Sequence, residues 1–375
     1  MSALPEPTAM SRTALLDELA LYLRPPGQGI YAVSTGKAAL EEATRSYLGG
    51  VDSNAPWRRH LETIADPDVG VALLGVPSDV GAGIVRGAAW GPTAIRRELG
   101  SAPVLDLGDV FTIPHLIEDE ACSTAQLERS REAMYAGVMA PFRRGLPVSP
   151  ISVTRRVYAL LAALDPDLKI MLLGGDHTVT WPAMAELLQG GPTRNEDVGI
   201  VHFDAHTDLM PERLGVEHCF ATWAWHANQL LGGGQRLIQL GIRASGKDRA
   251  HWERTEDVRQ VWAHEALEMG PEALASLVAE HLESIDVQRV YVSNDLDGTD
   301  AYWAAACGTP EPDGLTPDHV LAVLEALKGR FAVFGADLVE LAPGLSLDRE
   351  AADRSAKTAT RYVRKSLELL ESSKS

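Results

Sequence analysis

The sequence predicts an α/β fold in which one doubly wound, mainly parallel sheet lies between two layers of helices. Short runs rich in Val, Ile and Leu recur along the chain, and each is followed by a stretch with the periodicity of a helix. The runs are continuous rather than alternating, which is typical of strands buried on both faces. The chain has 375 residues, of which 45% are hydrophobic and 23% charged. It is therefore long enough to bury such a sheet.

The predicted strands define one domain over residues 69–345. Between residues 70 and 345 we find no internal repeat and no linker that would divide this domain. The runs at 104–107 and 260–262 are weaker strand patterns than the others. The predicted strands are residues 71–74, 104–107, 169–173, 198–203, 236–240, 260–262, 289–292 and 331–334.

Helical periodicity predicts helices between these strands. A Thr-Pro pair at 316–317 is a typical helix start and precedes one of them. Two polar stretches, 190–197 and 244–256, are expected to be surface loops. The predicted helices include residues 155–164, 272–285 and 318–328.

Both ends of the chain are expected to be additions to this domain. Residues 1–68 are predicted to form an N-terminal helical extension, with a helix over 11–23, a break at the Pro-Pro-Gly of 25–27 and a second helical pattern over 36–47. This arm would pack on the domain or on a neighbouring subunit. Residues 346–375 are expected to form a C-terminal helix and tail with a frayed end.

Charge and cysteine content exclude several classes of protein. The formal net charge is −18, which opposes binding to nucleic acid and favours cationic small molecules or metal ions. Three cysteines, Cys122, Cys219 and Cys307, are too few for a disulfide framework and favour a reducing compartment. We find no signal-peptide pattern at the N-terminus, and no apolar run approaches the roughly 20 residues of a membrane span. We therefore expect a cytoplasmic protein that binds neither nucleic acid nor membranes.

Three clusters of histidine and aspartate follow predicted strands. They are Gly-Gly-Asp-His-Thr at 174–178, Asp-Ala-His-Thr-Asp at 204–208 and Asp-Leu-Asp at 295–297. Taken singly, each has an ordinary explanation: a capped turn, a polar loop or a solvated strand end. Ligands bind outside the carboxyl ends of the strands in an open parallel sheet. The three clusters together therefore predict one site with nitrogen and oxygen ligands from three strands.

The spacing and charge of these ligands indicate what they hold. Asp295 and Asp297 are two residues apart in an extended segment, so both carboxylates point to the same side. Asp204 and Asp208 flank His206 in a short turn, which allows all three to converge. Four carboxylates would repel one another unless cations offset their charge. A pair of divalent ions bridged by carboxylates would do so.

These motifs resemble those of the ureohydrolase family, which contains arginases, agmatinases and related amidino hydrolases. The resemblance rests on residues 174–178, on Val-His-Phe-Asp-Ala-His-Thr-Asp at 201–208 and on Ser-Asn-Asp-Leu-Asp-Gly-Thr-Asp at 293–300. Gln-Leu-Gly-Ile-Arg at 239–243 is similar to the agmatinase-like branch, and supporting matches extend over residues 71–343. The resemblance implies a three-layer arginase-like sheet of about eight mainly parallel strands. It also implies two divalent metal ions per subunit and a homotrimer or homohexamer.

The resemblance implies a role for each ligand. Manganese is the usual metal, and nickel or cobalt would bind the same ligands. A hydroxide between the metals would attack the guanidinium carbon, with Asp208 accepting or steering its proton. By resemblance, one metal takes His177, Asp204, Asp208 and Asp295, and the other takes His206, Asp204, Asp295 and Asp297.

The resemblance also implies residues that bind the substrate. His218 lies where the family has a proton-shuttling histidine, and its free pKa of about 6.5 suits that task. Glu340 matches the carboxylate that pairs with the substrate guanidinium, and Thr309 matches a position beside it. The residues alone leave two alternatives open: a packed structural histidine at 218 and a surface ion pair at 340. His202, within a predicted strand, is expected to support the site from the core.

Departures from the family pattern bear on the substrate. The loop 301–307 lacks the two prolines usual in the family, and its Trp303 would narrow the substrate entrance. Residues 209–215 lack the Asn-, Ser- and Thr-rich pattern with which arginases bind an amino-acid head group. We therefore expect hydrolysis of agmatine, a guanidino acid or guanidine rather than arginine, with release of urea. The alternatives are a formimino hydrolase that releases formamide and a catalytically silent regulatory subunit with the same fold.

Overall fold

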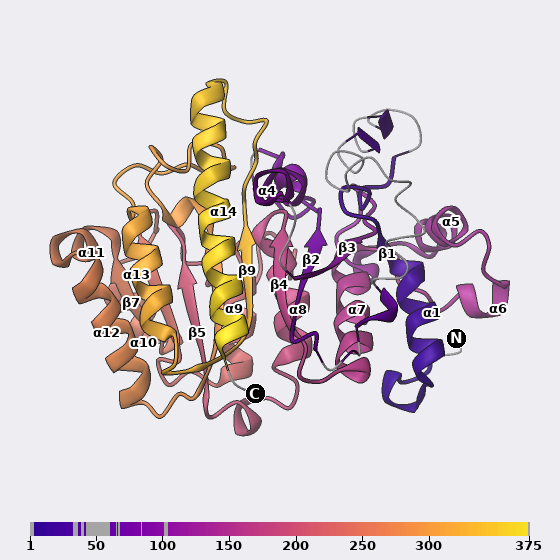
Figure 1. The fold of residues 1–375 in the computed structure, drawn as a ribbon, viewed down its shortest axis with the longest axis horizontal. Coiled ribbons are helices and arrows are strands. Elements are labelled where there is room, and N and C mark those ends of the chain that lie inside the picture. Colours follow the sequence, from indigo (N-terminus) through magenta and orange to yellow (C-terminus); the bar gives the residue numbers. More distant parts are fainter. Residues whose placement is uncertain are drawn as a thin grey trace.

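A nine-stranded sheet forms the centre of the molecule (Figure 1). Its strands follow the order β1-β3-β2-β4-β9-β8-β5-β6-β7, and every neighbouring pair is parallel except the edge pair of β1 and β3. This arrangement confirms the predicted doubly wound, mainly parallel α/β fold. The computed structural model describes residues 4–32, 37, 38, 41, 42, 61–64, 66, 68–83, 85–100 and 104–373.

All eight predicted strands are present, and the short edge strand β1 is the addition. Most of them lie within a residue or two of the predicted bounds, while β3, β8 and β9 extend further toward their carboxyl ends. The strands are β1 (Leu23–Arg24), β2 (Val71–Val76), β3 (Leu105–Val110), β4 (Lys169–Gly174), β5 (Val198–Phe203), β6 (Leu237–Ile242), β7 (Arg259–Trp262), β8 (Arg289–Asp295) and β9 (Ala332–Val339).

Helices cover both faces of the sheet (Figure 1). Successive strand residues point to opposite faces, so Leu73 packs in one apolar core and Leu74 in the other. Buried side chains of α1, α7, α8 and α9 contribute to one core, and those of α4, α11, α12, α13 and α14 contribute to the other. The helices are α1 (Arg12–Tyr22), α4 (Gly91–Leu99), α5 (Thr124–Met134), α6 (Ala140–Arg143), α7 (Pro150–Leu164), α8 (Thr180–Leu187), α9 (Trp223–Leu231), α10 (Arg249–Glu256), α11 (Ala263–Met269), α12 (Pro271–Ser284), α13 (Pro317–Leu327) and α14 (Arg349–Ser372).

The start of the N-terminal arm is built into the domain. Helix α1 confirms the predicted helix and packs on α7, where the Arg156 Nε and Nη2 atoms donate to the Glu18 carboxylate at 2.6 and 2.9 Å. Strand β1 then pairs with the edge strand β3. Of the helical pattern expected over 36–47, residues 37, 38, 41 and 42 are described and are helical, and the others lie outside the described residues.

Two local expectations were wrong. The stretch 244–256, expected to be a loop, contains α10, which begins where the Asp248 side chain accepts from the His251 N–H at 2.8 Å. None of the residues of α10 is buried, so it lacks the apolar stripe from which helices are recognised. The C-terminus is also packed rather than frayed as far as it is described, because the Val333 N–H donates to the buried Ser373 hydroxyl at 3.1 Å.

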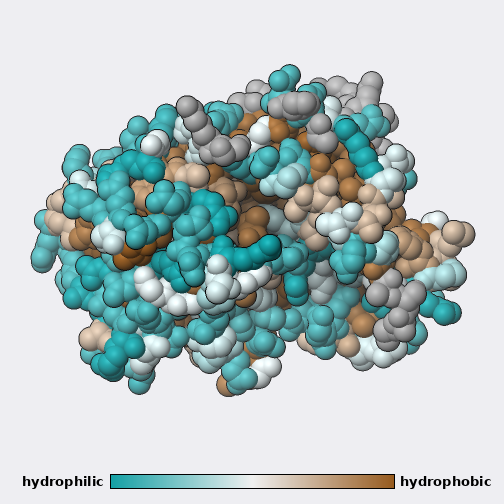
Figure 2. All heavy atoms as spheres, turned by 90° about the horizontal axis from the view of Figure 1, so that it is seen from below, coloured by the Kyte–Doolittle hydropathy of each residue, from teal (hydrophilic) through white to brown (hydrophobic). Residues whose placement is uncertain are grey.

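The surface is mostly hydrophilic in the view from below, and hydrophobic side chains gather near its middle and toward the right (Figure 2). The right-hand end is where α5 and α6 lie in Figure 1. Met139, beside α6, is 79% exposed, and Phe142 within it is also exposed. Among the described residues, no helix combines the length and the apolar character needed to cross a bilayer.

Candidate metal centre

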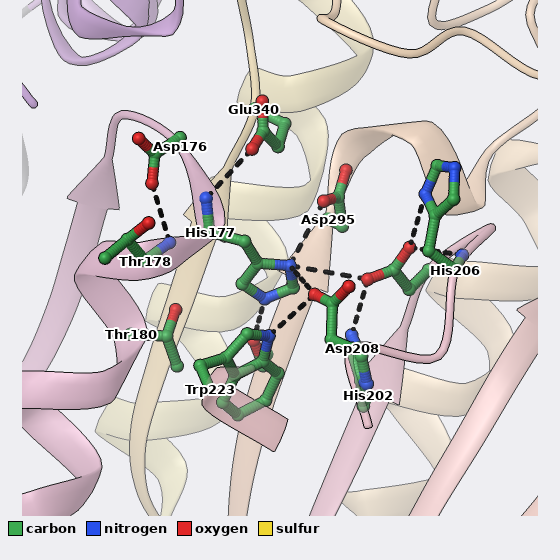
Figure 3. A network of polar contacts seen from close by, with 12 residues as sticks. Asp176, His177, Thr178, Thr180, His202, His206, Asp208, Trp223, Asp295 and Glu340 are labelled. Atoms are coloured by element: carbon green, nitrogen blue, oxygen red, sulfur yellow. Dashed lines mark hydrogen bonds and ion pairs between the residues drawn. The ribbon is translucent and has the colours of Figure 1, made fainter. Parts of the chain in front are cut away.

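Four neighbouring strands in the middle of the sheet carry the candidate site at their carboxyl ends. Strands β4, β9, β8 and β5 lie side by side in the sheet. His177 follows β4, residues 204–208 follow β5, residues 295–297 lie at the end of β8, and Glu340 follows β9. The topology thus brings together residues as many as 163 positions apart in the sequence (Figure 3).

Tight turns after the strands direct these side chains toward one another. Asp176 accepts from the backbone N–H two residues on at 2.7 Å, which caps the short 3₁₀ helix His177–Val179. Asp295 caps the turn after β8 in the same way, through the Asp297 N–H at 2.8 Å. Asp208 has a φ of 52°, in the left-handed region that aspartate tolerates better than most residues.

His177 is the centre of one half of the site. Its Nδ1 atom lies 3.1 Å from Asp295 Oδ2, 3.2 Å from Asp208 Oδ2 and 3.4 Å from Asp204 Oδ2. All four side chains are buried, and Figure 3 shows Asp208 and Asp295 beside the imidazole ring.

His206 is the centre of the other half. Its Nδ1 atom lies 3.3 Å from Asp204 Oδ1 and 3.2 Å from Asp297 Oδ2. Asp204 therefore joins the two halves, with one oxygen facing each histidine. The structure brings all six predicted ligands into one cluster, in which only His206 is partly exposed.

The charges in the cluster show what it is suited to hold. Burial, together with the charges of Asp297 and Asp204, raises the pKa of Asp295 well above its usual range. Burial alone would lower the pKa of His177, but hydrogen bonds to the surrounding aspartates raise it well above normal. So many buried carboxylates require positive charge among them. Imidazole nitrogens with carboxylate oxygens suit divalent ions such as Mn²⁺, so the donor set fits a binuclear metal site.

A second set of residues orients these ligands. His177 Nε2 contacts the Ser293 hydroxyl at 2.9 Å, and that hydroxyl donates to Asp337 Oδ1 at 2.9 Å. The Trp223 indole N–H donates to Asp208 Oδ2 at 3.0 Å, and its ring stacks on His177 with centroids 4.7 Å apart. Such outer partners fix the ring orientation of a ligand histidine. The motifs did not predict Ser293, Asp337 or Trp223 in these roles, because no spacing in the sequence marks them.

A hydrogen-bonded relay reaches Asp204 across three strands. The Trp262 indole donates to Gln260 Oε1 at 2.9 Å, and Gln260 Nε2 donates to Gln239 Oε1 at 2.8 Å. Gln239 Nε2 donates to His202 Nδ1 at 3.0 Å, which leaves His202 Nε2 to donate to Asp204 Oδ2 at 2.8 Å. His202 therefore contacts the site from the core, as the sequence led us to expect, and the glutamines assign its tautomer.

Glu340 lies beside the cluster with its backbone in the left-handed region, at a φ of 66°. Its Oε1 atom accepts from the His177 N–H at 2.9 Å. Burial, and then the charge of Asp176, raise the pKa of Glu340 well above its usual range. No lysine or arginine within the described part of the chain forms an ion pair with it, so the surface ion pair is not what the structure shows. Thr309 donates to Asp297 Oδ2 at 2.9 Å and so lies against the half of the cluster that contains His206.

Two predicted residues lie outside the contacts of this cluster. His218 Nδ1 bonds to Glu118 Oε2 at 2.6 Å, and its ring stacks on Trp181 with centroids 5.0 Å apart. Trp303 packs edge-on against Tyr302 and faces a cavity of about 370 Å³ beside α14, lined also by Arg354. The role of each in substrate handling stays a prediction.

Comparison with known proteins agrees with this geometry. The family model described as the Arginase family matches residues 69–367. The chain is 31% identical over 276 residues to N(1)-aminopropylagmatine ureohydrolase from Thermus thermophilus, covering 73% of this chain and 83% of that protein. It is 29% identical over 303 residues to guanidinobutyrase from Pseudomonas aeruginosa, covering 76% and 82%. A crystal structure of a hypothetical agmatinase from Burkholderia thailandensis superimposes with a TM-score of 0.56 at 25% identity, covering 80% and 87%.

The sheet and its histidine–aspartate centre define an α/β protein with a site suited to metal ions. The family model and the relatives define its class as a hydrolase of carbon–nitrogen bonds. The chain belongs to the Arginase family. This membership confirms the ureohydrolase resemblance and the fold expected from the sequence.

Proposed function

We propose that this protein hydrolyses a small guanidino compound to urea and an amine by means of two divalent metal ions. The observation that carries the proposal is the joint placement, at one edge of the sheet, of a six-ligand cluster and a buried carboxylate, Glu340. The guanidinobutyrase and aminopropylagmatine ureohydrolase names of two relatives support a guanidino substrate. Agmatine, a guanidino acid or guanidine itself fits better than arginine.

The six side chains would divide between two ions as the family resemblance implies. His177, Asp208, Asp204 and Asp295 would hold one ion, and His206, Asp297, Asp204 and Asp295 would hold the other. Two divalent ions there would supply activation of water and polarisation of the substrate. Manganese is the first choice for a carboxylate-rich site, with nickel or cobalt as the alternatives.

Glu340 would bind and orient the substrate. A carboxylate and a guanidinium form paired, charge-assisted hydrogen bonds in one plane. The His177 N–H already fixes one side of the Glu340 carboxylate, so the group is held in place before substrate arrives. Thr309 would limit the space next to it on the Asp297 side.

Two residues would move protons. The Trp223 indole N–H donates a hydrogen bond to Asp208 Oδ2. The other oxygen, Oδ1, would then accept or steer a proton from the attacking water. The leaving amine needs a proton, and His218 would provide it. Its Nδ1 atom is bonded to Glu118, so Nε2 is the atom available for that transfer.

A substrate screen tests the proposal. The protein, stripped of metal and reconstituted separately with Mn²⁺ and Ni²⁺, is incubated with agmatine, 4-guanidinobutyrate, guanidine, arginine and a formimino amino acid, and urea and formamide are measured. We expect urea from at least one guanidino compound and little from arginine, with loss of activity in His206→Ala. Two metal ions per subunit with no urea from any guanidino compound would contradict the proposal. Formamide from a formimino compound would identify the alternative enzyme. The cytoplasmic location and the homotrimer or homohexamer stay predictions.

A further inference from the structure

A second group of metal-ligating side chains lies outside the site described above. Glu217, His218 and His226 each offer one ligand atom, and these atoms lie within 4.8 Å of one another. The first two precede α9, and the third lies in its first turn. The group shares no residue with the six-ligand cluster.

A hydrogen bond occupies one nitrogen of each imidazole. The Glu118 carboxylate accepts from His218 Nδ1 at 2.6 Å, which in the neutral ring leaves the lone pair on Nε2. The backbone carbonyl of Glu217 accepts from His226 Nε2 at 3.1 Å, which leaves the lone pair on Nδ1. A ring nitrogen bonded to a carboxylate or carbonyl, with the other nitrogen free, is the usual arrangement of a metal-ligating histidine.

The rings are held in position and open to solvent. Trp181 lies 5.0 Å from both imidazoles, centroid to centroid, and the two imidazole centroids are 4.7 Å apart. A cavity of about 740 Å³ lined by His218, Glu217 and Glu118 reaches this group. The two arginines that line the same cavity, Arg155 and Arg156, are bonded to Glu186 and Glu18. Their charges are therefore already paired.

We propose that Glu217, His218 and His226 form a third cation site, selective for zinc, whose occupation blocks the proton donor. Two imidazoles and one carboxylate, with water in the fourth position, are a ligand set typical of Zn²⁺. The ion would occupy His218 Nε2, the atom that the proposed function assigns to the leaving amine. Excess zinc would therefore inhibit an enzyme whose six-ligand cluster still holds its own two metals. The inhibitory part of this inference rests on the proposed function, whereas the binding part does not.

Zinc binding is tested first, without reference to activity. Manganese-loaded protein is dialysed against increasing Zn²⁺, and both metals are counted per subunit. We expect one zinc to be taken up while manganese is retained, and His226→Gln to weaken this uptake by about tenfold or more. His264→Gln is the matched control, because His264 is exposed, lies beside Trp262 and belongs to none of the ligand groups among the described residues. Equal uptake by the wild type and His226→Gln would overturn the site.

Activity is tested second, on the same samples. His226→Gln should release urea at the wild-type rate without zinc and should need about tenfold more zinc for half inhibition. Inhibition that accompanies loss of manganese equally in both proteins would place the zinc in the catalytic centre and overturn the inhibitory role. If no guanidino substrate is hydrolysed at all, the proposed function fails, while the dialysis result still decides whether the zinc site exists.

Discussion

Glu340 combines a buried carboxylate with a backbone conformation that few glutamates adopt. Strained residues of this kind persist where the surrounding structure holds them, and they concentrate at functional sites. Here the His177 N–H and the end of β9 hold the side chain beside the cluster.

The Glu340→Gln variant tests the guanidinium contact. It keeps the size of the side chain but removes the charge, and a hydrogen bond to a charged group contributes about 1.5–3 kcal/mol. We expect kcat/KM to fall roughly 10- to 100-fold, while the number of bound metal ions stays unchanged. Glu128→Gln, an exposed residue of α5, is the control. Unchanged kinetics in Glu340→Gln would rule out its pairing with the substrate.

The hydrogen-bonded relay to Asp204 gives a second prediction about a single residue. In Gln239→Leu, the donor to His202 Nδ1 is lost, so the tautomer that donates to Asp204 is no longer selected. We expect metal affinity to fall by about 10- to 100-fold, measured by competition with a chelating dye. Gln288→Leu, at an exposed position, should bind metal normally. Equal affinities would show that the relay does not act on the metal site.

The convergence of the six histidine and aspartate side chains could be predicted from the sequence, whereas the residues that support them could not. Aspartate and histidine at spacings of two and four residues, repeated after several strands, are rare enough together to identify a site from local pattern. Trp223 and Ser293 look like ordinary helix and strand residues, and only the folded chain places them against Asp208 and His177. A local sequence pattern does not show which residues far apart in the chain come into contact in the folded protein.

Among the elements, the contact between α4 and β3 depends on a buried charge network. Arg96 of α4 donates to both oxygens of Asp106 at 2.8 and 2.9 Å, and it also pairs with Asp109. Asp109 in turn accepts from the Gly27 N–H of the arm at 2.7 Å. One arginine thus links α4, β3 and the arm.

The Arg96→Met variant should lose about 3–5 kcal/mol of unfolding free energy, because two buried carboxylates lose their cation. Arg97→Met, on the exposed side of α4, should change little. Burial raises the pKa of Asp109 even with Arg96 present, so the folded state binds that proton more tightly than the unfolded chain does. The loss of unfolding free energy in Arg96→Met should therefore become smaller as the pH falls from neutral toward the ordinary pKa range of carboxyl groups. Urea unfolding at several pH values measures both effects, and equal stabilities of the two variants would contradict them.

Elements with a strong apolar pattern were predicted well, and the exceptions are elements without one. All eight apolar runs became strands because both faces of the sheet are covered by helices. Helix α10 buries none of its residues, and β1 is only two residues long. A side-chain cap stabilises α10, and pairing with β3 stabilises β1. Neither interaction produces a periodic hydrophobic pattern in the sequence.

For the whole molecule, the metals are expected to contribute to stability as well as to reaction. A ligand that binds only the folded state at 100 times its Kd adds about 2.7 kcal/mol. Removal of metal should therefore lower the Tm by several degrees, and Mn²⁺ should restore it. His206→Ala should show a smaller response to Mn²⁺. An unchanged Tm after elemental analysis has confirmed complete removal would argue against coupling between metal binding and folding.

The order of the central strands also has a consequence for synthesis of the chain. As the protein emerges from the ribosome, His177 comes out first and the residues after β5 follow, yet the place between β4 and β5 belongs to β9 and β8, which are made last. A growing chain therefore exposes some of the histidines and aspartates of the cluster long before the complete site can assemble. Correct loading with metal must wait until translation is nearly complete.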